Sequence, residues 1–387
     1  MAGFSGGYGG YNAENLRHEV TVLLYKGVII VSRPEPLLTV SMSSTAKPTS
    51  SPLQHATSTK IRSMDSVRVL ATGGFVPDNV VRNEDLAKLG YDADWIIQRT
   101  GIRERRHAPP EMATSDMAIQ AAKQCIEQLD ANVDEIDLLI VATMTPDTPI
   151  PSTACLVQEA LGISAPAYDI NAACAGFMYA MVTGMQFVHS GAAQLALVIG
   201  ADKNSLIVDP ANKKTFPLFG DGAGAVMLGS RLDESATTTY TLGADGSGKD
   251  LLTLRAGGSR MPMTAELIGT DEQYLKMDGR SVFKWAVRML SETIQDVVQH
   301  AGLAIDDLDL IVLHQANLRI LHAAADDLGI PYDKLVVNVD RYGNTSAASI
   351  PLGLNDAARD GLLKEGDRVL ICGFGAGLAW GTAVLQW

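Results

Sequence analysis

Length, composition and charge set the first limits on what this chain can be. It has 387 residues, of which 47% are hydrophobic and 19% charged, enough for one large or two medium domains with a buried core. Its 31 lysines and arginines stand against 44 acidic residues, and the net charge of −13 argues against nucleic acid or an anionic membrane as the main partner. No apolar run approaches the ~20 residues that a membrane span needs.

The cysteines point to a reducing compartment. They follow no metal-ligand spacing, and no secretory signal precedes them. Their positions are Cys125, Cys155, Cys174 and Cys372. We therefore expect no bound metal and a cytoplasmic location.

Residues 1–63 differ in composition from the rest of the chain. Glycine and tyrosine repeats lead into a short apolar patch, and residues 41–63 are rich in Ser, Thr, Pro and Lys without periodicity. We expect a disordered or non-native extension, with Met64 as a candidate start. A targeting peptide is the alternative, but Glu14, Glu19 and the missing cationic start count against it.

Beyond this extension, strand and helix signals alternate and predict an α/β protein. Residues 67–71 form the first convincing strand. The further runs typical of buried strands are 138–143, 167–170, 195–200, 225–228, 310–313, 335–339, 369–372 and 383–385. The helical patterns are 115–129, 153–161, 175–190, 281–301, 318–328 and 346–359.

An internal repeat refines this prediction. Residues 125–141 (CIEQLDANVDEIDLLIV) and residues 297–313 (VVQHAGLAIDDLDLIVL) both read as a helix end, an acidic turn and a buried strand, 172 positions apart. We infer two duplicated halves, residues 64–235 and 236–387, each a mixed sheet with covering helices, packed about a pseudo-twofold axis. Chance likeness between two apolar strands is the alternative.

The repeat suggests where a site lies. Cys174, in DINAACAGFMYA (169–180), follows a predicted strand at a helix start, and Asn344, in YGNTS, holds nearly the equivalent place in the second half. His314 ends the strand 310–313, and strand ends beside helix starts are where α/β folds build sites. A pseudo-twofold axis would bring the three side chains together.

Each of these residue types suits acyl chemistry. A helix start favours the thiolate of Cys174, and its small neighbours leave room for a thioester. The imidazole of His314 can donate a hydrogen bond or move a proton, and the amide of Asn344 is a fixed donor for an enolate. Each residue also has a structural alternative when it is taken singly: Cys174 as a small core residue, His314 as a structural histidine and Asn344 as a turn residue. We assign the other three cysteines to the core.

Two glycine-rich segments have the composition of phosphate-binding loops, but the strands that follow them do not fit such loops. Residues 220–224 (GDGAG) and 373–377 (GFGAG) each run into an apolar strand instead of opening a helix. Tight turns at the floor of a site explain them better than a dinucleotide site.

The blocks DINAACAGFMYA, LHQANLRI, GNTSAAS and GFGAGLAWG resemble β-ketoacyl-acyl carrier protein synthase III, the initiating condensing enzyme of type II fatty acid synthesis. The resemblance runs from about residue 64 to residue 387. It implies a thiolase fold in αβαβα layers, a homodimer that needs no cofactor, and a triad of Cys174, His314 and Asn344. A short acyl-CoA would acylate Cys174, and malonyl-acyl carrier protein would then condense with loss of carbon dioxide.

The resemblance also implies contacts around the triad. Backbone N–H groups of Cys174 and Ala376 would hold the oxyanion, and Phe219 would line the acyl tunnel. Ile150 matches the position where a partner subunit closes the end of that tunnel. Ordinary core packing is the alternative for Phe219.

Coenzyme A and carrier protein would meet the surface outside the tunnel. Trp95 would stack on adenine and Arg99 lie near the phosphates, while Lys213 stands where the family usually has arginine; core packing is again the alternative for Trp95. Arg319 would contact the acidic carrier, together with Lys284 and Arg288 one helical turn apart, unless these basic residues form a solvated face. Asp326 and Asp327 occupy places where the family commonly has lysines.

Three other functions stay open at this point. The order Cys, His, Asn is also that of papain-like hydrolases, although their local cysteine signature is absent. A binding protein with this fold but no turnover is the second, since fold does not dictate function. The third is a starter-selective synthase of a secondary pathway, or one that takes malonyl-CoA.

Overall fold

The computed structural model describes residues 21–25, 28–32, 60–230 and 237–387. The chain forms two units, Met1–Ser51 and Pro52–Trp387. In the first, β1 (Thr21–Tyr25) and β2 (Val28–Ser32) pair antiparallel as a hairpin. The rest of the expected extension up to residue 59, and the expected border between the halves at 235/236, lie outside the described residues.

Ten strands of the second unit form two five-stranded sheets. The first sheet consists of β4 (Val67–Phe75), β10 (Gly222–Ser230), β9 (Leu195–Asp202), β7 (Leu138–Ala142) and β8 (Ala167–Ile170), in that order. The second consists of β14 (Leu310–Leu313), β15 (Arg368–Gly375), β16 (Ala379–Gln386), β11 (Thr237–Ala244) and β3 (Arg62–Asp65). Both sheets are mixed, because β7 runs parallel to β8 and β9, and β14 parallel to β15, beside antiparallel pairs.

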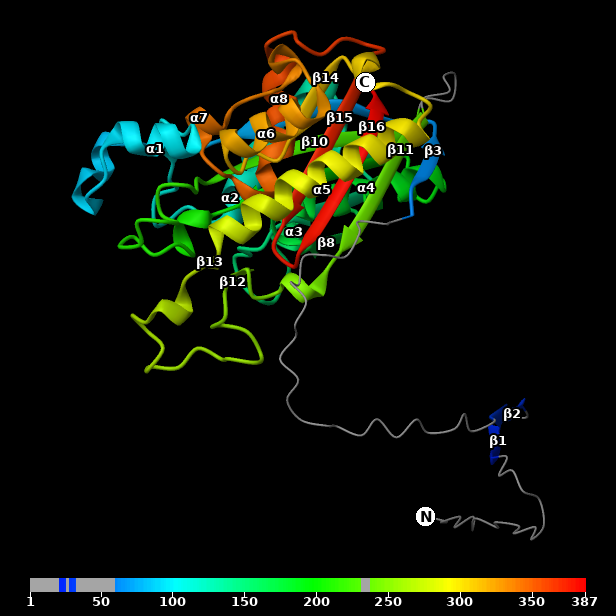
Figure 1. Cartoon of the computed structure of the whole chain (residues 1–387). Coiled ribbons are helices and arrows are strands. Elements are labelled where there is room, and N and C mark those ends of the chain that lie inside the picture. Colours follow the sequence, from blue (N-terminus) through cyan, green and yellow to red (C-terminus); the bar gives the residue numbers. More distant parts are fainter. Residues whose placement is uncertain (1–20, 26–27, 33–59, 231–236) are drawn as a thin grey trace, which may run out of the picture. The chain divides into compact units, whose positions relative to one another are not determined.

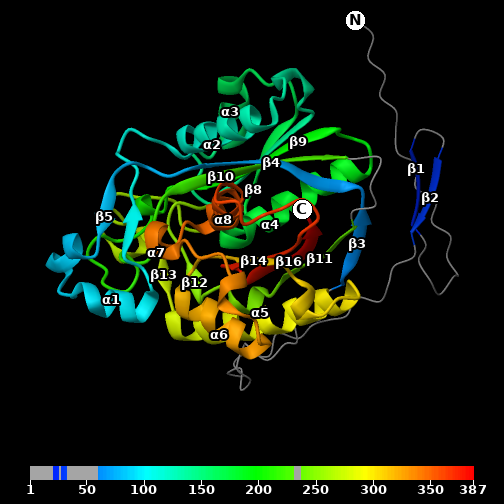
Figure 2. The ribbon, with the colours of Figure 1, turned by 90° about the horizontal axis from the view of Figure 1, so that it is seen from above.

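Helices cover both sheets and fill the space between them. The six larger ones are α2 (Thr114–Leu129), α3 (Thr153–Leu161), α4 (Gly176–His189), α5 (Gly279–His300), α6 (Leu318–Leu328) and α8 (Ser349–Arg359). Figure 1 shows α5 crossing the face of the second sheet, and in Figure 2 the layers follow one another from α2 and α3 to α5 and α6. Since α4 and α8 contact strands of both sheets, the order is αβαβα, as expected.

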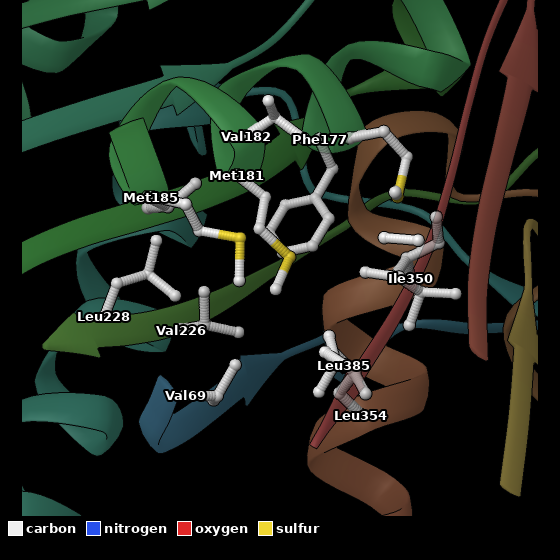
Figure 3. Packing of buried hydrophobic residues seen from close by; sticks show 14 of the residues in the cluster. Val69, Phe177, Met181, Val182, Met185, Val226, Leu228, Ile350, Leu354 and Leu385 are labelled. Carbon is white, nitrogen blue, oxygen red and sulfur yellow. The ribbon is translucent and has the colours of Figure 1, made fainter. Parts of the chain in front are cut away.

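The central layer buries most of its side chains because it faces a sheet in each direction. Phe177 and Met181 of α4 point towards Ile350 and Leu354 of α8 in one buried cluster (Figure 3). These four side chains are each no more than 1% exposed. The cluster fixes the two helices, and with them the turns from which they start.

The repeat predicted from the sequence is present as structure. The 3-10 turns η2 (Val133–Glu135) and η7 (Ile305–Asp307) lie 172 positions apart, each just before its sheet's parallel strand. After them the N–H of Asp137 donates to Leu195 O, and the N–H of Asp309 to Arg368 O, both at 2.9 Å. The order β7, β9, β10, β4 is repeated by β14, β15, β16, β11, so the halves share one topology over these four strands.

The second sheet lacks the counterpart of β8. The sequence predicts a strand at 335–339, but Leu335 makes only a single bridge to Ile311 there, and α7 (Val339–Tyr342) begins at the end of this segment. That strand prediction is wrong, because the chain leaves the edge of the sheet after one pairing. At the opposite edge β3 pairs with β11, so the ordered fold begins before Met64.

Smaller elements surround one end of the layers. They are α1 (Ala93–Thr100), the antiparallel pair β5 (Val80–Arg82) and β6 (Glu104–Arg106), and the antiparallel pair β12 (Leu252–Thr253) and β13 (Lys276–Met277). Within the part of the chain that is described, no helix combines the length and apolarity needed to cross a membrane.

Candidate active site

A strained turn presents Cys174 to the interior. After β8, the side chain of Asn171 accepts a hydrogen bond from the N–H of Ala173 at 3.1 Å. Ala173 has φ 48°, in the left-handed region that non-glycine residues rarely adopt. Cys174 follows in the short 3-10 turn η3 (Ala173–Ala175), and α4 begins at Gly176. The thiol is thus fixed at the start of a buried helix, as the sequence predicts.

The second half repeats this turn around Asn344. Its side-chain oxygen accepts from the N–H of Ser346 at 2.9 Å, and Ser346 has φ 51°. The 3-10 turn η9 (Ser346–Ala348) then leads into α8. The true counterpart of Asn344 is therefore Asn171, and that of Cys174 is Ala347, a shift of three residues from the pairing inferred above.

This turn decides which part of the Asn344 amide meets a ligand. Its oxygen is engaged by the chain, so the NH₂ group remains as a donor. The backbone is fixed as well, because Asn344 N–H donates to Leu218 O at 2.8 Å and its carbonyl accepts from Gly220 N–H at 3.0 Å. These bonds hold the amide in one place, which is what a preorganised donor requires.

All three predicted residues line one cavity of about 140 Å³. Cys174, His314 and Asn344 come from three different segments, and their side chains are 4%, 1% and 6% exposed. His314 follows β14, and its ring meets that of Phe374 edge to face at 5.0 Å. The other lining residues are mostly apolar: Leu218, Phe219, Leu252, Met277, Gly279, Val282, Phe283, Trp285, Ala316, Asn317, Ile320, Phe374, Gly375 and Leu378. The cavity joins a thiol, an imidazole and an amide in a mostly apolar surrounding.

Burial controls the protonation of this site. It raises the pKa of the Cys174 thiol to about 12, and the charge of Asp202 raises it as well, although contacts with Ser346 and with the backbone N–H of Cys174 lower it. The sequence-based expectation of a favoured thiolate is thus wrong for the resting protein, because desolvation outweighs the helix start. Burial also lowers the pKa of His314 to about 3, so the imidazole is neutral at physiological pH.

A buried polar network ties the two halves together at the cavity. The hydroxyl of Ser346 donates to the Asn204 side-chain oxygen at 2.9 Å. The Asn204 amide group donates in turn to Gly220 O at 2.7 Å and to Asn344 O at 3.3 Å. Sequence reasoning missed Asn204 and Ser346, and only their positions beside a predicted strand end and beside Asn344 could have indicated them.

A larger cleft of about 920 Å³ leads to the cavity, since the two share Leu218, Met277, Gly279, Phe283 and Asn317. Six cationic side chains line this outer cleft, against one carboxylate, that of Asp278. They are Arg99, Lys213, Lys214, Arg280, Lys284 and Arg319. In a chain of net charge −13 this is a local site for an anion.

The outer cleft brings together the three residues expected to contact coenzyme A. Trp95 lies at its wall, and Arg99 is 5.6 Å from the centre of the indole. Tyr91, which sequence reasoning missed, stacks on Trp95 with ring centres 4.2 Å apart and planes 1° apart. The Nζ of Lys213 lies 5.6 Å from the Tyr91 ring, so these aromatic and cationic groups form one stack.

Three predicted residues lie apart from the cavity and the cleft. Ile150 is 87% exposed and lines neither space. Arg288 forms an ion pair with Glu292 at 3.7 Å and does not join Lys284 in the cleft. Ala376 packs against the cluster that contains Phe219, while its neighbour Gly375 lines the cavity.

Neither glycine-rich segment opens a helix. Residues 220–224 lead into β10, and residues 373–377 span the end of β15 and the turn towards β16. A Cβ on Gly375 would lie 2.8 Å from the backbone nitrogen of Cys174. The segments let the backbone approach the site closely, as the tight-turn interpretation predicts.

The fold and the cavity define the class. Two sheets in αβαβα layers, with a cysteine at the start of a buried central helix, make up a condensing enzyme of the thiolase fold. Residues 168–246 match the family description 3-oxoacyl-[acyl-carrier-protein (ACP)] synthase III, and residues 298–387 match the C-terminal description of the same family.

Known proteins narrow the class to one family. The β-ketoacyl-[acyl-carrier-protein] synthase III of Rhodopirellula baltica is 55% identical over 342 residues, covering 84% of this chain and 99% of the relative. A crystal structure of the Thermus thermophilus synthase III covers 82% of this chain and 98% of its own at 43% identity, with a TM-score of 0.77. The priming β-ketosynthase of the R1128 polyketide pathway is 33% identical, covers 84% and 97%, and has a TM-score of 0.77. The chain belongs to the β-ketoacyl-[acyl-carrier-protein] synthase III family.

Proposed function

We propose that the protein starts fatty acid synthesis by joining a short acyl group to malonyl-acyl carrier protein. The observation that carries the proposal is the meeting of Cys174, His314 and Asn344 in one cavity that opens into a cationic cleft. The acyl-CoA reacts first. The thiol of Cys174 attacks the thioester carbonyl, the proton passes to the departing coenzyme A sulfur, and an acyl-cysteine remains.

Geometry at Cys174 supports this first step. Gly375 faces the backbone N–H of Cys174 without a side chain, which leaves room there for the oxyanion of the tetrahedral intermediate. Ala376 keeps its proposed role as the second donor. Because burial holds the thiol protonated at rest, loss of the proton accompanies attack and does not precede it.

His314 and Asn344 serve the second step. Both are neutral donors, and together they hold the malonyl thioester carbonyl while the carboxylate leaves as carbon dioxide. The enolate attacks the acyl-cysteine, and the sulfur of Cys174 departs and takes up one proton. The products are 3-oxoacyl-acyl carrier protein and carbon dioxide. A neutral imidazole suits this task, since a charged one would hold the malonyl carboxylate in place.

The size of the cavity favours a short starter. At roughly 30 Å³ for a water-sized group, 140 Å³ accommodates about four or five heavy atoms. Phe219 forms part of its wall and limits its depth. No organic cofactor is required by this chemistry, because the thiol, imidazole and amide supply every group it uses.

The outer cleft binds the carriers of both substrates. Trp95, Arg99 and Lys213 contact the coenzyme A head, with the indole ring against its base and the cations against its phosphates. Arg319 and Lys284 line the same cleft and contact the acidic acyl carrier protein. Arg288 lies outside the cleft and contacts the carrier beyond it. The protein functions in the cytoplasm as a homodimer, in which the exposed Ile150 closes the partner's tunnel.

One experiment tests the proposal and ranks the starters. The purified protein is incubated with a panel of acyl-CoAs and analysed by mass spectrometry, which locates the modified residue. We expect acyl groups on Cys174 with short chains, none in Cys174→Ala, and carbon dioxide release once malonyl-acyl carrier protein is added. Modification of another residue, or hydrolysis without carbon dioxide release, contradicts the proposal.

An asparagine variant separates the two steps. Asn344→Ala keeps the thiol and its oxyanion donors, so we expect acylation to persist while condensation is lost. Equal loss of both steps contradicts the role given to Asn344. The synthase III relatives, at 55% and 43% identity, are more similar to this chain than the R1128 priming enzyme at 33%, so a secondary-pathway synthase is not favoured.

A further inference from the structure

A buried carboxylate, that of Asp202, lies at the end of β9 in the same half as the reactive thiol, and it contacts the turn of the other half. Asp202 is completely buried, and no described cation pairs with it. One of its oxygens accepts from the hydroxyl of Thr143 at 3.0 Å, the N–H of Met144 at 2.8 Å and the hydroxyl of Thr145 at 3.1 Å. The other accepts from the N–H of Ala347 at 3.0 Å. Such a group is costly to bury, so this concentration of donors needs an explanation.

The duplication supplies one. Strand β9 in the first sheet corresponds to β15 in the second, and Asp202 corresponds to Gly375, 173 positions later. The same offset relates Cys174 to Ala347. Each strand end therefore lies over the 3-10 turn of the other half: Asp202 over Ala347, and Gly375 over Cys174.

The two places where a strand end lies over a turn differ in the residue that faces the backbone N–H group of the turn. At Ala347 that N–H donates to the Asp202 carboxylate. At Cys174 the opposing residue is a glycine, and a Cβ there would lie 2.8 Å from the Cys174 nitrogen. One N–H is thus occupied by an internal anion, and its counterpart is left open by the missing side chain.

We propose that Asp202 is a positioning residue whose carboxylate fills, in the second half, the place that the substrate oxyanion takes in the first. By holding the N–H of Ala347 it fixes the turn that carries Asn344 and Ser346. The protein therefore contains one open oxyanion site for acyl transfer and one closed copy that supports the donor for condensation. This inference rests on the proposed function of the cavity.

Two variants of Asp202 distinguish the effect of its negative charge from the effect of its side-chain volume. Asp202→Ala removes the carboxylate and leaves a hole lined by the donors of Thr143, Met144, Thr145 and Ala347. Asp202→Asn fills the hole, but its NH₂ group must face a backbone N–H, whichever way the amide turns. Asp356→Asn is the control, because it neutralises another buried carboxylate, one that binds Arg341 and Arg359 away from the cavity.

Acylation of Cys174, carbon dioxide release from malonyl-acyl carrier protein, and the melting temperature are measured for each variant with and without formate. We expect both Asp202 variants to keep acylation and to lose condensation by about 10- to 100-fold, the range for a displaced catalytic group. Formate should restore condensation and raise the melting temperature in Asp202→Ala alone, since only that variant has room for it. The control should lose stability without separating the two steps.

The outcomes that would overturn this inference differ from those that would overturn the proposed function. Full condensation in Asp202→Asn, equal loss of both steps in Asp202→Ala, or no response of Asp202→Ala to formate overturns the inference. A wild-type protein that is never acylated overturns the proposed function instead. In that case the change in melting temperature with formate still decides whether Asp202 fills an anion site.

Discussion

Ala173 and Ser346, 173 positions apart, share a left-handed backbone, with φ 48° and 51°. Each residue follows an asparagine by two positions, and each donates its N–H to that asparagine's side chain. A left-handed conformation costs an L-residue roughly 1–2 kcal/mol. Because the strain occurs at both halves, it belongs to the turn itself, which brings the chain from a strand end directly into a central helix.

Changing Ala173 tests this strain. Glycine has no Cβ to clash, but it adds about 0.4–1 kcal/mol of chain entropy to the unfolded state. We expect Ala173→Gly to leave the free energy of unfolding unchanged or to raise it by up to about 1 kcal/mol, and Ala173→Val to lower it by more than the roughly 1–2 kcal/mol of the alanine strain. Urea unfolding measures both. A destabilised glycine variant contradicts the strained turn.

Much of this fold follows from apolar patterning. The bounds of short strands such as 167–170 and 310–313, and of helices such as 153–161 and 318–328, agree with the sequence prediction residue for residue, although 167–170 is only half-buried. The duplication could be predicted from the sequence because both copies keep the acidic turn before the strand. The strand predicted at 335–339 is wrong. An apolar run has the same sequence pattern whether it pairs with a neighbouring strand along its whole length or at one residue.

Some residues of the site could also be predicted from the sequence, and others could not. Cys174, His314 and Asn344 could be found from strand ends and duplication, and the structure places them in one cavity. Asp202 and Gly375 could not, because their roles depend on which strand end crosses which turn. Tyr91 carries no sequence signal, since its position against Trp95 depends on side-chain packing.

Gly375→Ala should affect the first chemical step. The added Cβ would lie 2.8 Å from the Cys174 nitrogen and would displace an oxyanion from that N–H. Loss of one such donor typically costs about 10²–10³ in rate, which is the drop we expect in Cys174 acylation. Single-turnover acylation followed by mass spectrometry measures it.

Gly373→Ala is the matched control for this variant. It lies on the same strand, and its Cβ would be equally close, 2.8 Å, to a side-chain carbon of Met178. It should therefore cost stability without selective loss of acylation. If both variants slow acylation to the same degree, crowding of the strand explains the effect and the oxyanion role of Cys174 N–H is wrong.

Tyr91→Ala should improve recognition of coenzyme A. Tyr91 covers one face of Trp95, so a base that stacks on that face must first displace it. Aromatic pairs contribute about 0.5–1.5 kcal/mol, and their loss should lower the KM for acyl-CoA by up to about tenfold. The KM for an acyl-pantetheine, which lacks the base, should not change.

A second stacked pair provides the control for Tyr91. His322 and Tyr332 stack with ring centres 4.3 Å apart, and neither residue lines the cavity or the outer cleft. Tyr332→Ala should leave both KM values as they are. A higher KM for acyl-CoA in Tyr91→Ala would show instead that the tyrosine is part of the binding platform.

Burial of His314 should make the protein sensitive to acid. Its folded pKa is lowered to about 3 from an ordinary 6.5, so below pH 6.5 the unfolded chain binds a proton that the folded protein refuses. Stability from this group is therefore complete above pH 6.5 and declines as the pH falls towards 3, by at most about 1.4 kcal/mol per pH unit.

Comparing the wild type with His314→Gln isolates this contribution. Asp202 acts with the opposite sign, because burial raises its pKa to about 6 and favours the folded state at low pH, but both proteins keep Asp202. We expect the free energy of unfolding, measured in urea between pH 7.5 and pH 4.5, to fall less steeply with acid in the variant. Parallel curves would mean that His314 takes up its proton at an ordinary pKa in the folded protein, so that burial does not keep the imidazole neutral in acid.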